Sequence, residues 1–315
     1  MAVIKYQEEE IISNGLSDQA NVYLDFCWKV IDVCNYKCSY CSAGYGHKST
    51  RPVSNFRDPN VSSAWKNVIQ RLKFKRLSPF ILDLLGGEPT LHPNITDIIE
   101  SVIDINKCFK VILTTNLSRP VEFYLNLPDS DKLIINASIH FEYYDEMLVD
   151  KLIEINKHKS IHALIMIHDD IKYKSKMTEF IKRISDHDIS YGFTHLFPTS
   201  TYTPDYSTNH YNEMKDILIK SNDKSQVTGG RNMYEFSTAR SKLMLTQKQV
   251  IDAELNRFEG WDCSAKSWDI STSGEFLNSC TREPLDVLYR NINTTVKCPV
   301  ECCQCTAFWH YDKHK

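Results

Sequence analysis

Short apolar runs alternate with amphipathic stretches between residues 22 and 197. Six of these runs have the length and β-branched content of buried strands: 22–33, 80–85, 110–115, 132–139, 161–167 and 191–197. Such short runs, bounded by turn-forming residues, favour strands over buried helices. Apolar residues recur at helical spacing in the stretches between them: 61–72, 95–105, 145–158 and 173–187. The pattern therefore predicts six strands with helices between most of them.

Strands that alternate with helices pair in parallel, because right-handed crossovers return the chain to the same end of the sheet. We expect an α/β fold, a partial (β/α)6 TIM-type barrel with a small cysteine-rich C-terminal β-hairpin/helix module. Asn94 precedes the second helical stretch and is its expected N-cap. Ligands of parallel α/β sheets bind at the carboxyl ends of the strands, so the loops there are the candidates for function.

The pattern divides the chain into an extension, the barrel core, a linker and a terminal module: 1–21, 22–198, 199–260 and 261–315. The extension is polar, too short for an independent leader-binding domain, and expected to pack on the barrel's edge. Pro, Thr, Ser and Tyr crowd the start of the linker, and helices are expected near 209–221 and 245–257.

Three cysteines follow the first predicted strand, spaced C-x3-C-x2-C at Cys34, Cys38 and Cys41. Three thiolates on one loop can hold three corners of a cubane iron–sulfur cluster and leave the fourth iron open to a small molecule. A zinc site is the competing interpretation, but zinc sites usually show two C-x2-C pairs, or one pair with histidines. An odd number of clustered cysteines without a secretion signal argues against disulfides.

The second predicted strand runs directly into Gly86-Gly87-Glu88-Pro89. Glycines allow the backbone to approach a ligand closely, because no Cβ stands in the way. Glu88 supplies an acceptor for an ammonium group, and Pro89 stiffens the loop.

The cysteine spacing and this loop about 50 residues later together resemble the signature of the radical S-adenosylmethionine (SAM) enzymes. The resemblance implies a [4Fe-4S] cluster on the three cysteines, with its open iron chelating S-adenosyl-L-methionine. It also implies that one aromatic residue and the glycine loop contact SAM: Tyr40, Gly86, Gly87, Glu88 and Pro89. The family's shared chemistry is one-electron cleavage of SAM to methionine and a 5′-deoxyadenosyl radical, which abstracts hydrogen from a substrate.

Polar residues at other strand ends are further candidates for contact with SAM or the substrate. Those after the third and fourth strands are Thr114, Thr115, Asn116, Ser138 and His140. His168, Thr194 and His195 stand at the fifth and sixth strands. The alternative for each is a polar residue whose hydrogen bonds are satisfied within the strand end.

Six cysteines fall in the terminal module: Cys263, Cys280, Cys298, Cys302, Cys303 and Cys305. Alternation around Gly274 predicts a β-hairpin between the first two of them. A hairpin followed by a cysteine knot resembles the SPASM and twitch appendages of radical SAM enzymes, which bind auxiliary [4Fe-4S] clusters. One auxiliary cluster is expected here, because the module is short.

Four ligands suffice for one cluster. Cys263 and Cys280 are the firmest candidates, and the C-x2-C pair Cys302 and Cys305 copies the twitch pattern. Pairing of Cys305 with Cys298 or with Cys303 competes with that choice. A spare thiol, Cys298 or Cys303, is either idle or a catalytic hydrogen donor. The alternative for the whole module is a structural zinc site.

Composition narrows the class of protein further. The chain has 315 residues, 42% of them hydrophobic, which is ample for a core. Its 37 basic and 40 acidic residues give a net charge of −3, so no basic surplus suggests nucleic acid. No stretch is apolar over the ~20 residues of a membrane helix. Eleven cysteines without a secretory signal indicate metal chemistry in a reducing cytoplasm.

We expect a radical SAM enzyme acting on a small molecule, such as a sugar, polyol or nucleoside, by dehydrogenation or epimerisation. Radical modification of a peptide is the alternative, and a cysteine-rich zinc-binding interaction protein is the non-enzymatic one. An electron donor such as flavodoxin or ferredoxin is the expected partner.

Overall fold

The computed structural model describes residues 12–14, 24–41, 59–74, 77, 79–196, 233–237, 242–246, 257–263, 267–279, 284, 296–299 and 313–314. Structural statements below concern these residues alone. The expected helix at 209–221 and most of the one at 245–257 lie outside them, as do four of the terminal cysteines: Cys280, Cys302, Cys303 and Cys305.

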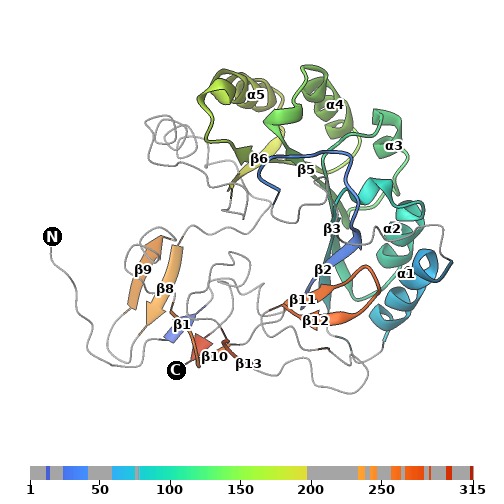
Figure 1. Ribbon diagram of the computed structural model, residues 1–315, viewed down its shortest axis with the longest axis vertical. Helices are drawn as coiled ribbons and strands as arrows, with labels where there is room; N and C mark the ends of the chain where they lie inside the picture. The colour runs from blue at the N-terminus through green and yellow to red at the C-terminus, as the bar shows by residue number, and fades with distance from the viewer. Residues whose placement is uncertain are drawn as a thin grey trace.

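An eight-stranded sheet forms the centre of the fold (Figure 1). Six of its strands lie side by side in chain order and run parallel: β2 (Leu24–Ile31), β3 (Phe80–Gly86), β4 (Cys108–Thr115), β5 (Leu133–Ile139), β6 (Ile161–Ile167) and β7 (Ser190–His195). The sheet does not close, because β7 and the C-terminal strand β12 form its two edges. The predicted partial (β/α)6 barrel is confirmed.

Helices line the outer face of this sheet: α1 (Pro59–Leu72), α2 (Ile95–Ile103), α3 (Val121–Leu125), α4 (Met147–Asn156) and α5 (Lys174–Asp186) (Figure 1). The sequence pattern missed α3, whose 5 residues are too few to show helical spacing. Asn94 is the N-cap of α2 as predicted, but its side-chain amide donates to Asp97 at 3.1 Å and caps no helix N–H. No helix among the described residues is long and apolar enough to cross a membrane.

Alternation along the strands separates a buried outer face from a more polar inner face. In β2, Leu24, Phe26 and Trp28 are at most 2% exposed and belong to the core. Burial of a side chain of this size contributes about 2 kcal/mol to stability. Asp25 and Cys27, which lie between them, keep part of their surface accessible. The inner face is therefore where polar chemistry can occur.

The predicted hairpin is confirmed as β11 (Ser267–Ile270) and β12 (Phe276–Asn278), which pair antiparallel. Gly274 in the turn has φ +83°, a conformation that glycine adopts without strain. β11 also pairs in parallel with β2. The hairpin therefore extends the barrel's sheet, whereas we expected it to belong to the appended module.

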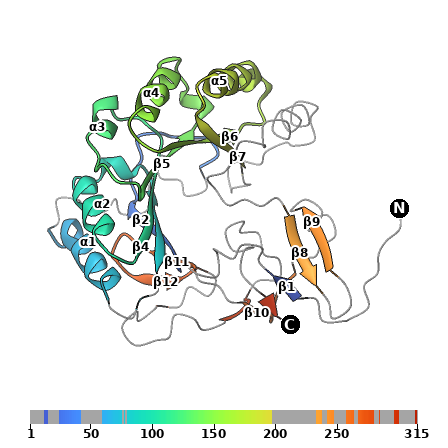
Figure 2. The ribbon, with the colours of Figure 1, turned by 180° about the vertical axis from the view of Figure 1, so that it is seen from behind.

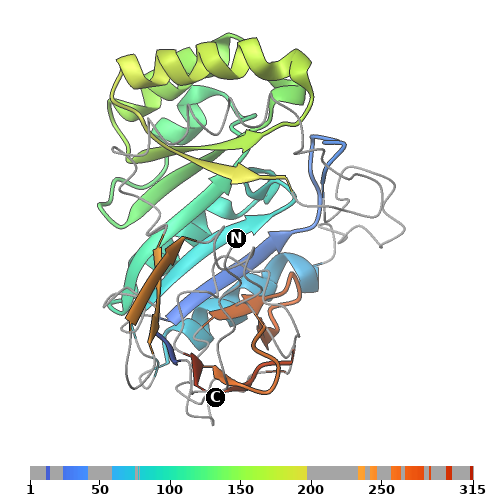
Figure 3. The same ribbon diagram turned by 90° about the vertical axis from the view of Figure 1, so that its left-hand side faces the viewer.

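A second sheet gathers short strands from both ends of the chain: β1 (Ile12–Asn14), β8 (Met233–Ser237), β9 (Lys242–Thr246), β10 (Asp262–Cys263), β13 (Val296–Lys297) and β14 (Lys313–His314). Figures 2 and 3 show β8 and β9 on the side of the barrel's sheet that faces away from the helices. Of the extension, residues 12–14 are described, and they pair with β8 and β14. One expectation needs correction, because residues 245–246 are strand and not helix.

Candidate active site

The loop after β3 lies against the segment that leads from β2 to the cysteines. The N–H of Gly87 donates to the Ile31 carbonyl at 2.9 Å, and that of Glu88 to the Val33 carbonyl at 2.8 Å. A Cβ on Gly86 or Gly87 would stand 2.1 Å from one of these two oxygens. Glycine is required because two backbones meet here, whereas we expected a ligand to be the close neighbour.

The Glu88 carboxylate points into the protein. Its side chain is 1% exposed and accepts hydrogen bonds from the Thr90 N–H at 3.1 Å and the Thr90 hydroxyl at 2.6 Å. The Thr115 hydroxyl and the Asn116 N–H each donate to it at 2.7 Å. Pro89 starts the short 3-10 helix η1 (Pro89–Leu91) that presents Thr90. Glu88 thus joins the end of β3 to the end of β4, and its expected contact with SAM stays a prediction.

The cysteine loop holds three thiols near one another. The Tyr36 N–H donates to the Cys34 sulfur at 3.4 Å, and the Asn116 amide lies 3.9 Å from the same sulfur. Burial is the largest cause that raises the pKa of Cys38, to about 12, and the charges of Glu142 and of the two other cysteines add to it. The sulfurs are therefore close enough to repel one another as thiolates.

These residues fit an iron–sulfur cluster better than a single metal ion. Within the described ranges, no three His, Cys, Asp or Glu side chains converge on one ion position. In a cluster each thiolate binds a different iron, so the sulfurs need not converge. Bound iron would also relieve the repulsion that raises the thiol pKa values.

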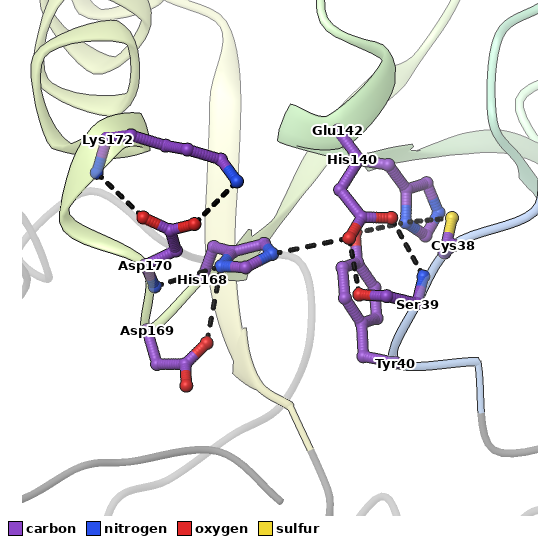
Figure 4. A network of polar contacts seen from close by, with 9 residues as sticks. All are labelled: Cys38, Ser39, Tyr40, His140, Glu142, His168, Asp169, Asp170 and Lys172. Atoms are coloured by element: carbon purple, nitrogen blue, oxygen red, sulfur yellow. Dashed lines mark hydrogen bonds and ion pairs between the residues drawn. The ribbon is translucent and has the colours of Figure 1, made fainter. Parts of the chain in front are cut away.

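The loop after β5 also contacts the cysteine loop, on a different side from the Gly-Gly-Glu-Pro loop (Figure 4). Glu142 accepts hydrogen bonds from both the N–H, at 2.8 Å, and the hydroxyl of Ser39. The Tyr143 hydroxyl accepts one from the Lys37 N–H at 2.7 Å, and the Tyr143 ring stacks on Tyr36 with centroids 4.1 Å apart. The sequence did not predict these contacts between the two loops, because they join residues more than 100 positions apart and no local motif marks them.

His140, which precedes Glu142, lies against the cysteine loop. Its Nδ1 is 3.0 Å from the Tyr40 hydroxyl and 3.6 Å from the Cys38 sulfur, and its ring stacks on Tyr40. Burial lowers the pKa of His140 to about 4, so the ring is neutral at pH 7. Nδ1 of His168 accepts from the Asp170 N–H at 3.0 Å, while its Nε2 lies 3.6 Å from Glu142 (Figure 4). The structure thus brings both predicted histidines to one network beside the cysteines.

A family model described as "Radical SAM superfamily" matches residues 28–204, more than half of the chain. The chain belongs to the radical SAM superfamily. The match begins within β2 and includes β3 to β7, the cysteine loop and the Gly-Gly-Glu-Pro loop.

Curated relatives carry the name GTP 3′,8-cyclase. That of Vibrio parahaemolyticus is 25% identical over 197 residues, covering 58% of this chain and 56% of its own. That of Haemophilus influenzae is 22% identical over 252 residues, covering 72% of each. The chain spans about half the length of the first of these relatives. In fold it resembles Streptococcus suis SuiB, solved bound to S-adenosylmethionine, with a TM-score of 0.54, 14% identity and coverage of 85% of this chain and 64% of that one.

The other residues predicted to contact SAM or the substrate differ in their hydrogen-bond partners. The Thr115 hydroxyl is committed to Glu88, and that of Thr114 donates to Asp83 on the inner face at 2.8 Å. The Asn116 side chain reaches the cysteine loop, donating to Asn35 at 3.0 Å. The hydroxyl of Ser138 makes no hydrogen bond to any described residue. Thr194 is half-buried, and nothing is described of the His195 side chain.

Two of the six terminal cysteines are described, and both are buried. Cys263 ends β10, and Cys298 follows β13, its N–H donating to the Trp261 carbonyl at 2.8 Å. Cys263 pairs with Val296, so Cys298 stands two positions farther along the antiparallel ladder and on the same face. The sequence leaves Cys298 as either a competing ligand or a spare thiol, and the register of β10 and β13 makes it a neighbour of Cys263.

Substitution of Gly87 by Ala tests the backbone contact. The new methyl group would stand 2.1 Å from the Val33 carbonyl oxygen, so one of the two loops must move. We expect a loss of about 2 kcal/mol or more in the free energy of unfolding, measured in urea. Gly260→Ala is the control, because no atom of the described residues lies within 4 Å of the added methyl group and only the φ of +77° is unfavourable for alanine. Equal losses in the two variants would contradict the contact.

Replacing Glu88 by Gln tests whether the carboxylate is a structural anchor. The amide end would bring an N–H group against a protein donor, leaving hydrogen bonds unmade inside the core. We expect about 1–3 kcal/mol lower stability in protein without SAM. The exposed Glu100→Gln provides the control. A side chain that serves only SAM would leave the stability of SAM-free protein unchanged.

The inner face makes stability depend on pH. Burial raises the pKa of Asp83 from 3.8 to about 7, and Asp25 adds to the rise. The native state therefore holds its proton more tightly than the unfolded chain, and stability falls as pH rises from about 4 to 7. We expect Asp83→Asn to be about 1–3 kcal/mol more stable than wild type at pH 8 and about equal to it at pH 4. The surface variant Asp129→Asn, compared by thermal unfolding, should show no such difference.

Proposed function

We propose that this radical SAM enzyme cleaves SAM reductively and abstracts hydrogen from a small organic substrate. One observation carries the proposal: the Gly-Gly-Glu-Pro loop and the cysteine loop are hydrogen-bonded together at the carboxyl ends of β2 and β3. Parallel α/β sheets bind their ligands at this edge.

Each residue of the site has a task in this proposal. Cys34, Cys38 and Cys41 hold the [4Fe-4S] cluster, which when bound supplies the electron that breaks the C–S bond of SAM. Glu88 fixes the loop whose backbone faces SAM. Glu142 fixes the cysteine loop through its hydrogen bond with Ser39 and so holds the thiolates at a constant position relative to the end of β5. An external donor such as flavodoxin or ferredoxin provides the electrons.

An auxiliary cluster of the SPASM or twitch kind is part of the proposal. Cys263 and Cys298 support it, because they are buried and lie on one face of the same ladder. Cys298 therefore joins the proposed ligands, and Cys280, Cys302 and Cys305 remain candidates for the other positions. Cys303 is left as the candidate hydrogen donor.

We propose that the reaction is dehydrogenation or epimerisation and that the substrate is a sugar, polyol or nucleoside. The name of the cyclase relatives supports a small substrate over a peptide. A substrate identical to theirs is not implied, because the first of them is 25% identical and matches over 56% of its length.

The iron content tests both clusters. Anaerobically reconstituted protein should bind about eight irons, from two four-iron clusters. Replacing Cys34, Cys38 and Cys41 together by Ala should leave about four, and Cys263→Ala alone should remove the other four. A wild-type value of four would contradict the auxiliary cluster. Retention of eight in the triple variant would contradict the first site.

Turnover without substrate tests the proposed reaction. The reduced enzyme should convert SAM slowly to 5′-deoxyadenosine, and the triple cysteine variant should form none. The product is measured by chromatography. Absence of 5′-deoxyadenosine in iron-replete wild type would overturn the proposal.

A further inference from the structure

A polar layer crosses the inner face of the barrel's sheet below the active site. It contains one residue from each of five neighbouring strands: Asp25, Asp83, Thr114, Asn136 and His162. The last three stand directly opposite one another in the register, and the two aspartates continue the line diagonally. Branched apolar side chains usually fill the interior layers of such barrels. A polar layer here needs a functional explanation.

The hydrogen bonds in the layer run in one direction. The Asn136 amide donates to the Thr114 hydroxyl at 3.2 Å, and this hydroxyl donates its only proton to Asp83 at 2.8 Å. The only proton of Thr114 is then used. The groups left over include three acceptors: the second oxygen of Asp83, the Asp25 carboxylate and the Asn136 carbonyl. A ligand that satisfies them must bring donors.

One of these acceptors is a buried atom without a partner. Asn136 is 9% exposed, and its Oδ1 accepts no hydrogen bond from any residue that the structure describes. A buried acceptor left unpaired costs about 1–3 kcal/mol, so its presence on the same line as the aspartates indicates a missing donor. His162 stands directly across from Asn136, and among the described residues its Nε2 has no partner, whereas its Nδ1 lies 2.9 Å from the Ser190 hydroxyl.

The two carboxylates also lack a compensating charge. Neither Asp25 nor Asp83 forms an ion pair with a described residue, and burial raises the pKa of Asp25 to about 6. Both nevertheless keep some accessible surface on the inner face. Buried carboxylates in proteins are normally paired with a cation, so these two are poised to receive one from a ligand.

We propose that this layer recognises a protonated amine on the substrate. The inference rests on the proposed function, because it concerns the molecule from which hydrogen is abstracted. Asp83 lies three residues before Gly86, which places the bound ammonium roughly 10 Å below the strand ends. The reacting carbon of the substrate then lies at the mouth of the barrel. The same carboxylates repel a triphosphate, so the layer disfavours the nucleotide named for the cyclase relatives.

Binding of simple amines tests the proposal without turnover. Reconstituted enzyme with SAM but no reductant is titrated calorimetrically with 6-aminohexanol and with 1,6-hexanediol, which differ in the ammonium group. A second arm compares N-acetyl-Gly-Lys-Gly-amide with its norleucine counterpart, both blocked at their termini, to distinguish a free amine from a lysine side chain. We expect saturable binding of at least one amine, tenfold or more tighter than its uncharged counterpart.

Variants locate the binding to the layer. Asp83→Asn and Asp25→Asn should each weaken amine binding tenfold or more, and the surface variant Asp129→Asn should not. Asp25 donates and accepts no hydrogen bond within the described residues, so Asp25→Asn tests the charge without changing the Thr114–Asp83 hydrogen bond. No amine binding, equal binding of the uncharged probes, or unchanged binding in both variants would each overturn the proposal. Formation of 5′-deoxyadenosine in the same preparations reports separately on the proposed function.

Discussion

A buried carboxylate at the end of β3 holds together the segments that meet at the mouth of this barrel. Glu88 receives four hydrogen bonds from Thr90, Thr115 and Asn116, so a charge that would be costly in the core is fully compensated. Its own N–H binds the carbonyl of Val33, next to the first cysteine. One residue thus fixes three segments relative to one another: its side chain joins β3 to β4, and its backbone N–H joins them to the start of the cysteine loop.

The opposite side of the cysteine loop is fixed by a different strand. Glu142 and Tyr143, which follow β5, hold Ser39 and Lys37 by hydrogen bonds to their N–H groups. The loop is therefore held on both sides by hydrogen bonds to its backbone N–H and C=O groups and to the Ser39 hydroxyl. This arrangement explains how a short irregular loop can present three thiolates with a fixed geometry, as preorganised metal sites require.

Local signals predicted much of this architecture. The six parallel strands, the hairpin around Gly274 and the two motif loops follow from apolar periodicity and from short sequences whose chemistry is self-contained. The environment of Glu88 was not predictable, because a sequence shows a carboxylate but not the donors that surround it. The inner polar layer was also missed, although Asp25 and Asp83 interrupt apolar strands at inward-facing positions. The second sheet joins segments hundreds of residues apart, and no local pattern encodes such pairing.

We propose that the cysteine loop, held by Glu88 and Glu142, carries a cluster whose open iron binds SAM. Electron paramagnetic resonance of the reduced protein tests it directly, in a Cys263→Ala variant in which the proposed auxiliary cluster would give no signal. Addition of SAM should change the spectrum of that variant, because SAM becomes a ligand of the cluster. A spectrum that does not respond to saturating SAM would contradict the account.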